Sequence, residues 1–152
     1  MMNYKQIEVG KISMQDWLRS GAMLLSAVLL LSACSKKISF QTSAAVPAAE
    51  GQVKMKKDKN NNYHLEINLR NLAEPKRLDP PRSTYVVWIE TERNGTKNVG
   101  QLKTSSGLFS STLKASLETV TAYKPQLLFI TAEDNADVQY PGMQVVLRTS
   151  RF

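Results

Sequence analysis

Several residue types on which function often depends are scarce in this sequence. Its 152 residues include one cysteine and one histidine. A single cysteine excludes a disulfide within the chain, and a single histidine excludes the usual ligand spacings of zinc sites. The longest apolar stretch, Gly21 to Ala33, has thirteen residues, whereas a transmembrane helix needs about 20. The sequence therefore favours neither a multispan membrane protein nor a small disulfide-stapled fold.

Catalytic signatures are also missing. There is no G-x-S-x-G motif to suggest a serine hydrolase, and His64 lies beside Glu66 on the polar face of an expected strand, where we interpret it as structural. An acidic loop contains Glu133, Asp134, Asn135 and Asp137. It offers oxygen ligands for calcium but lacks the EF-hand spacing, so a solvated turn is favoured and ion binding stays an alternative. We predict no enzyme, no metal and no cofactor.

The apolar stretch follows a leader that contains Lys5, Lys11 and Arg19, which is typical of a secretory signal. Translation starting at Met2 or Met14 would shorten this leader without changing the mature protein. The stretch closes with Leu31-Ser32-Ala33-Cys34, which resembles the lipobox of bacterial lipoproteins.

This resemblance implies a signal peptide over residues 1–33, cleavage before Cys34, and lipid (diacylglycerol and a fatty acid such as palmitate) on Cys34. The alternatives are a permanent membrane helix or a spare cysteine. In proteobacterial lipoproteins the residue after the cysteine sorts between membranes, and Ser35 in place of Asp indicates the outer membrane. Lys36 and Lys37 stand where some phyla carry an acidic surface-export tag, which favours a domain that faces the periplasm.

The chain that starts at Cys34 is basic. Residues 1–33 hold three of the 20 basic and two of the 13 acidic side chains, so 17 and 11 remain, a net charge of +6. Export makes nucleic acid an unsuitable partner, and anionic lipids, lipopolysaccharide or cell-wall polymers become the fitting counter-charges. The alternative is that the charge only keeps the domain soluble. The candidate residues for binding an anionic surface are Lys54, Lys56, Lys57, Lys59, Lys76, Arg77 and Arg82.

Small residues dominate from Ser35 to Gly51, so residues 34–51 are predicted to form a flexible, lipidated tether, in which Ile38 and Phe40 alternate with polar neighbours as in a short strand. From residue 52 to 152 the apolar pattern has period two, with a hairpin turn near residues 58–62, a proline-rich loop at 71–83 and a buried strand at 84–92. Asn94-Gly95 predicts a second hairpin, in which both residues tolerate positive φ.

Residues 126–131 and 143–149 complete the expected strands, whereas Thr112 to Tyr123 fits either a strand or a short helix. The fold class is therefore an all-β, immunoglobulin-like antiparallel sandwich of about seven strands. We expect Trp88, in the middle of the central strand, to pack between the two sheets.

Several of these segments occur in a familiar order. Tyr85 to Ile89, Val99 to Leu102, Phe129 to Asp134, Pro141-Gly142 and Val145 to Leu147 resemble the extracytoplasmic C-terminal domain of anti-sigma-K factors. That resemblance spans about Val53 to Phe152 and implies an immunoglobulin-like sandwich. It does not extend to sigma-factor binding, because the short leader has no room for the intracellular domain of those regulators.

The sequence thus predicts a non-enzymatic, membrane-anchored envelope lipoprotein that acts as a binding or interaction module in the periplasm. Its partners would be the membrane, through the lipid at Cys34, and an envelope protein or an anionic polymer. The alternative is a structural or assembly subunit of an envelope complex that uses a sheet edge to pair with a partner protein.

Overall fold

Antiparallel β-strands dominate the part of the chain that the computed structural model describes, residues 35–106 and 113–152. In chain order the strands are β1 (Lys36–Ser39), β2 (Glu50–Lys57), β3 (Tyr63–Arg70), β4 (Thr84–Thr91), β5 (Gly95–Gln101), β6 (Lys103–Ser106), β7 (Leu113–Thr121), β8 (Pro125–Glu133) and β9 (Val145–Arg148). Within these ranges the only helical element is the 3-10 turn η1 (Pro75–Arg77), and no helix is long and apolar enough to cross a membrane. The predicted signal peptide, the lipidation at Cys34 and the end of the turn expected at Ser105 to Gly107 lie outside the described residues.

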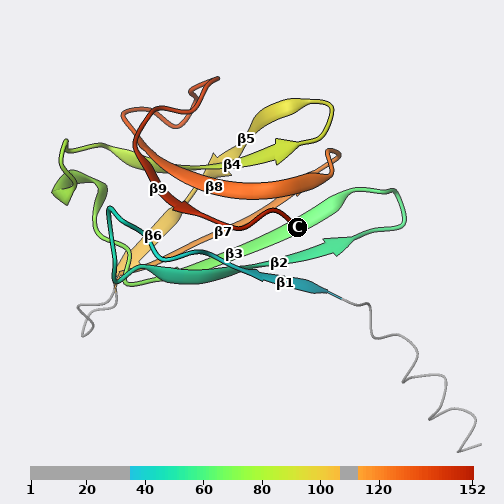
Figure 1. Ribbon diagram of the computed structural model, residues 1–152, viewed down its shortest axis with the longest axis horizontal. Coiled ribbons are helices and arrows are strands. Elements are labelled where there is room, and N and C mark those ends of the chain that lie inside the picture. Colours follow the sequence, from blue (N-terminus) through green and yellow to red (C-terminus); the bar gives the residue numbers. More distant parts are fainter. Residues whose placement is uncertain (1–34, 107–112) are drawn as a thin grey trace, which may run out of the picture. The chain divides into compact units, whose positions relative to one another are not determined.

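The strands form two sheets, one of five strands in the order β1-β2-β3-β7-β6 and one of four in the order β5-β4-β8-β9 (Figure 1). The order β2-β3-β7-β6 corresponds to strands A-B-E-D of an immunoglobulin-like sandwich, and β5-β4-β8-β9 corresponds to C′-C-F-G. The predicted fold class is confirmed. The described residues contain nine strands rather than about seven, because β1 joins the five-stranded sheet and because the chain through Val99 and Leu102 divides into β5 and β6, which belong to different sheets.

The core between the sheets follows from the alternation of apolar residues. Leu65, Ile67 and Leu69 of β3 are at most 2% exposed, and the residues between them form part of the outer face of the five-stranded sheet. The segment that fitted either a strand or a short helix contains strand β7, which pairs with β3 from Lys114 to Thr121. Along a strand, side chains alternate between the two faces of the sheet, whereas along a helix they do not. Pairing with β3 therefore requires this segment to be a strand.

The second predicted hairpin forms, but its turn differs from the expected type. Thr91 pairs with Gly95 across three turn residues. Gly95 has a φ of 66°, whereas Asn94 is not among the residues with positive φ. A three-residue connection closed by a left-handed glycine is a common hairpin geometry, so the Asn-Gly pair marks the turn while only its glycine needs the left-handed conformation.

Residues 35–51 pack against the sandwich, so the prediction of a flexible tether is wrong. β1 pairs with β2 over all four of its residues. Further along, the Ser43 hydroxyl donates a hydrogen bond to the carbonyl of Val146 and accepts one from the backbone N–H of Val46, and both Val46 and Ala49 are buried. The small side chains that suggested a linker let this segment lie close against β9, so the sandwich begins at β1.

The two faces of β4 belong to separate hydrophobic clusters. Tyr85, Val87 and Ile89 lie in the core between the sheets. Trp88 is fully buried but belongs to the outer face of the four-stranded sheet, with Phe129 and Val138. The expectation that Trp88 packs between the sheets is therefore wrong, because the loop after β8 covers the outer face of the sheet at this point.

This cover loop, residues 134–144, is held by a chain of hydrogen bonds that starts at Trp88. The indole N–H donates to the Thr131 hydroxyl at 2.8 Å, and that hydroxyl donates to the carboxylate of Glu133 at 2.5 Å. The same carboxylate accepts the backbone N–H of Gly142 at 2.7 Å. Thr131 is fully buried and Glu133 is 8% exposed, so the chain satisfies polar groups that would otherwise be costly to bury.

Candidate functional site

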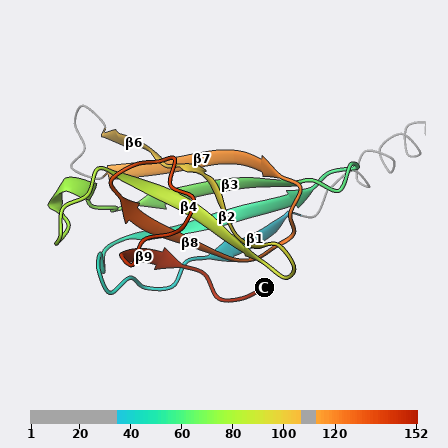
Figure 2. The same ribbon diagram turned by 90° about the horizontal axis from the view of Figure 1, so that it is seen from above.

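A basic surface forms at the end of the five-stranded sheet where β1 begins. The register places Lys36 opposite Met55 and Lys37 opposite Lys54, and β2 then runs on to its turn with β3. Both views show the start of β1 and the β2–β3 turn at the same end of the sandwich (Figures 1 and 2). We call this surface the basic end and define it by Lys36, Lys37, Lys54, Lys56, Lys57 and Lys59.

The other predicted cationic residues lie elsewhere, so one continuous patch does not form. β3 starts at the β2–β3 turn and ends at Arg70, after which the proline-rich loop leaves from the opposite end of the sheet. Lys76, Arg77 and Arg82 are carried by this loop. An eight-residue strand separates the two groups, which corresponds to about 26 Å at 3.3 Å per residue.

Some of the predicted cationic residues form ion pairs within the protein. Arg82 donates to Asp134 at 2.7 Å and to the side-chain carbonyl of Gln144 at 3.0 Å, which fastens the cover loop. Lys54 contacts Glu66 at 2.9 Å, and this hydrogen bond lowers the pKa of the Glu66 carboxyl. In the described residues the other five lysines of the basic end make no ion pair.

The β2–β3 turn is ordered by Asp58. Its carboxylate accepts the backbone N–H groups of Asn60 and Asn62 at 2.8 and 2.9 Å, and it lies 3.2 Å from Nε2 of His64. The Asn62 N–H is the main cause that lowers the pKa of Asp58. The turn therefore presents its lysines from a fixed backbone, and the contact of His64 with Asp58 gives the histidine a structural partner.

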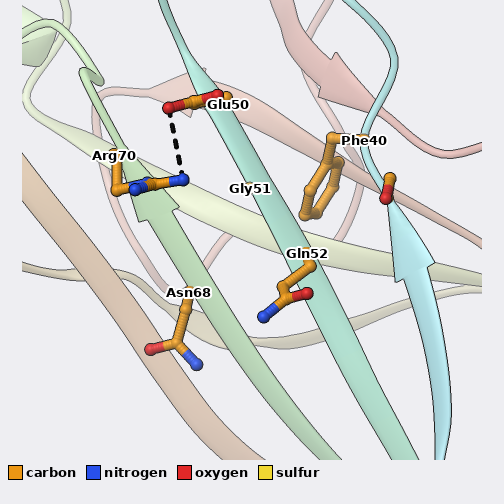
Figure 3. Close-up of a pocket in the computed structure, with 7 residues that line it drawn as sticks. Phe40, Glu50, Gly51, Gln52, Asn68 and Arg70 are labelled. Carbon is orange, nitrogen blue, oxygen red and sulfur yellow. Dashed lines mark ion pairs between the residues drawn. The ribbon is translucent and has the colours of Figure 1, made fainter.

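A second candidate site is a shallow groove of about 590 Å³ on the five-stranded sheet. It is lined by Ser39, Phe40, Glu50, Gly51, Gln52, Asn68 and Arg70. In Figure 3, Phe40 lies on one side of Gly51 and Arg70 on the other, and Arg70 contacts Glu50 at 3.4 Å. The groove is at the Glu50–Arg70 end of β2 and β3, away from the β2–β3 turn.

Sequence reasoning missed this groove. The hairpin turn does fix the pairs Glu50 with Arg70 and Gln52 with Asn68, so part of the lining could have been derived from strand register. The position of Phe40 could not, because it depends on β1 joining the sheet and on the bridge between Phe40 and Thr149.

The acidic loop has partners of its own within the protein. Glu133 accepts hydrogen bonds from Thr131 and Gly142, and Asp134 pairs with Arg82. Over residues 35–106 and 113–152, no group of three or more His, Cys, Asp or Glu side chains is arranged to hold a metal ion.

Comparisons with known proteins add no relative. A scan against models of protein families, a search of curated proteins and a search of solved structures each found no match for this chain.

Proposed function

We propose that the protein is a non-enzymatic envelope lipoprotein, anchored by lipid at Cys34 to the periplasmic face of the outer membrane, whose sandwich acts as a binding module. One observation carries this proposal most directly. β1 begins at Lys36, two residues after Cys34 in sequence, and the register places Lys37 opposite Lys54, on the strand that leads to the lysines of the β2–β3 turn.

Lipid and charge then act at the same end of the domain. Two or three acyl chains attach a protein effectively permanently, at about 0.8 kcal/mol per buried CH₂. Each lysine near an anionic membrane surface adds about 1 kcal/mol. Since β1 joins the sheet almost immediately after Cys34, we infer that the basic end faces the lipid headgroups and that the groove faces away from them.

The anchor is tested by metabolic labelling with an alkyne fatty acid, followed by membrane fractionation, on the natural chain and on Cys34→Ser. We expect label and membrane association for the natural chain and neither for the variant. An unlabelled natural chain, or one that fractionates with the cytoplasm, would refute the proposal.

The orientation is tested by amide hydrogen exchange of the lipidated protein in anionic and in zwitterionic vesicles. We expect residues 54–59 to gain protection in anionic vesicles only, and to lose it when Lys56, Lys57 and Lys59 are changed to glutamate. Lys76→Glu with Arg77→Glu is the control, because it alters charge at the opposite end. Equal protection at both ends would contradict this orientation.

The alternative function, an assembly subunit that pairs a sheet edge with a partner, must use an edge other than that of β9. The segment after β1 already bonds to β9, through Gln41 N–H to Arg148 and the Ser43 hydroxyl to Val146. β1, β5 and β6 are the remaining candidates, as outer strands of their sheets. Salt separates the two functions, because binding through lysines weakens as ionic strength rises whereas strand pairing does not.

A further inference from the structure

We propose that the groove around Gly51 is a binding site for a neutral glycan. The inference deepens the proposed function, on which the choice of an envelope glycan as ligand rests. It depends on three properties of the groove, which are its polar side chains, its aromatic wall and its charge.

The polar lining is rich in groups that can bind neighbouring hydroxyls in pairs. The amides of Gln52 and Asn68, the guanidinium of Arg70 and the carboxylate of Glu50 each present two polar atoms in one plane. Among the described residues the Gln52 side chain has no protein hydrogen-bond partner, and the Asn68 amide donates only to Glu66. The groove therefore keeps both donors and acceptors available to a ligand.

The groove has an aromatic wall beside Gly51. Gly51 lies between Phe40 and Arg70 in Figure 3, and a Cβ at this position would lie 2.4 Å from the carbonyl oxygen of Asn68. The half-buried Phe40 ring is part of the groove lining, and the apolar C–H face of a sugar ring can rest on an aromatic face. The volume of about 590 Å³ is within the range of about 300–1,000 Å³ usual for small-ligand sites.

The charge of the groove argues for a neutral ligand. Arg70 and Glu50 are the two charged residues of the lining and lie 3.4 Å apart, so their charges offset each other. A phosphate or carboxylate would be repelled by Glu50, and an ammonium group by Arg70. The lysines that would attract an anion belong to the basic end instead.

The experiment uses the full ¹⁵N-labelled chain in a detergent without a sugar headgroup, titrated with three probes. Two are neutral, an oligomer of N-acetylglucosamine and a maltooligosaccharide, and the third is a sulfated oligosaccharide. We expect at least one neutral probe to shift the amide signals of Gly51, Gln52 and Asn68 saturably, with a Kd on the order of 1 mM for so open a site. The two neutral probes show whether acetamido groups are required.

Gln52→Ala and Asn68→Ala should each weaken binding about five- to ten-fold, the effect of one lost hydrogen bond. Asn60→Ala removes an exposed amide at the β2–β3 turn and should leave binding unchanged. The inference is overturned if neither neutral probe binds, if the shifts lie outside the groove, or if only the sulfated probe binds. The titration does not require acylated Cys34, so its failure is distinct from failure of fatty-acid labelling.

Discussion

Replacing Thr131 by valine tests whether the chain of hydrogen bonds under the cover loop stabilises the fold. Valine matches threonine in shape but has no hydroxyl. The indole N–H of Trp88 then loses its acceptor, and Glu133 loses one donor while it keeps the N–H of Gly142. An unsatisfied buried donor costs about 1–3 kcal/mol, and a hydrogen bond to a charged group contributes about 1.5–3 kcal/mol.

Because Glu133 keeps one partner, we expect Thr131→Val to lower the free energy of unfolding by about 2–4 kcal/mol. For a urea m value of about 2 kcal/mol/M, the unfolding midpoint would fall by roughly 1–2 M. The measurement is urea unfolding of the full chain, followed by circular dichroism. Thr131→Ser is the matched control, since it keeps the hydroxyl and loses only a methyl group, at about 1 kcal/mol. Equal midpoints for the two variants would refute the reasoning.

Two further predictions concern pH. Burial raises the pKa of Tyr85 to about 12, above its unfolded value of about 10, so stability should fall as pH rises above about 10. A near-ultraviolet titration should show one tyrosine that resists ionisation, and Tyr85→Phe should remove it; ionisation of every tyrosine near pH 10 in the folded protein would contradict this. The lowered pKa of Asp58 means that its contribution is present at neutral pH and is lost as pH falls through that lowered pKa. The protection factors of the Asn60 and Asn62 amides, which correct exchange rates for their intrinsic pH dependence, should therefore fall in acid, and Asp58→Asn should abolish that acid dependence; an unchanged profile in the variant would count against the role of the carboxylate.

Period-two alternation was sufficient to predict the hairpins, the buried strands and the sandwich, because it states which residues share a face of a strand. It does not state which face lies between the sheets. Tyr85 and Trp88 lie on opposite faces of β4, but both are buried, since the cover loop hides the outer one. A loop that covers a sheet leaves little signal in composition.

The expected tether was wrong for a related reason. Ser43, Val46 and Ala49 are small, and small residues are common both in linkers and where backbones pack closely. The sequence alone does not separate these cases, because the contact with β9 is more than 100 residues away along the chain.

The predicted cationic set, in contrast, could have been corrected without a structure. A turn near residues 58–62 and a loop at residues 71–83 are joined by a single strand, and a strand has two ends. The lysines of the turn and the basic residues of the loop were therefore bound to be separated. The groove depended on long-range pairing of β1, which no local pattern reveals.

The early start of β1 has a mechanical consequence. Consider a force that pulls on the residues before Lys36 along the direction of β1 while a ligand is held near Gly51. This force would load the backbone hydrogen bonds between β1 and β2 simultaneously rather than one after another. Hydrogen bonds that are loaded in this shearing geometry must break together, so the strand pair resists a larger force. The same four residues that add an outer strand to the sheet would thus make its attachment strong under tension.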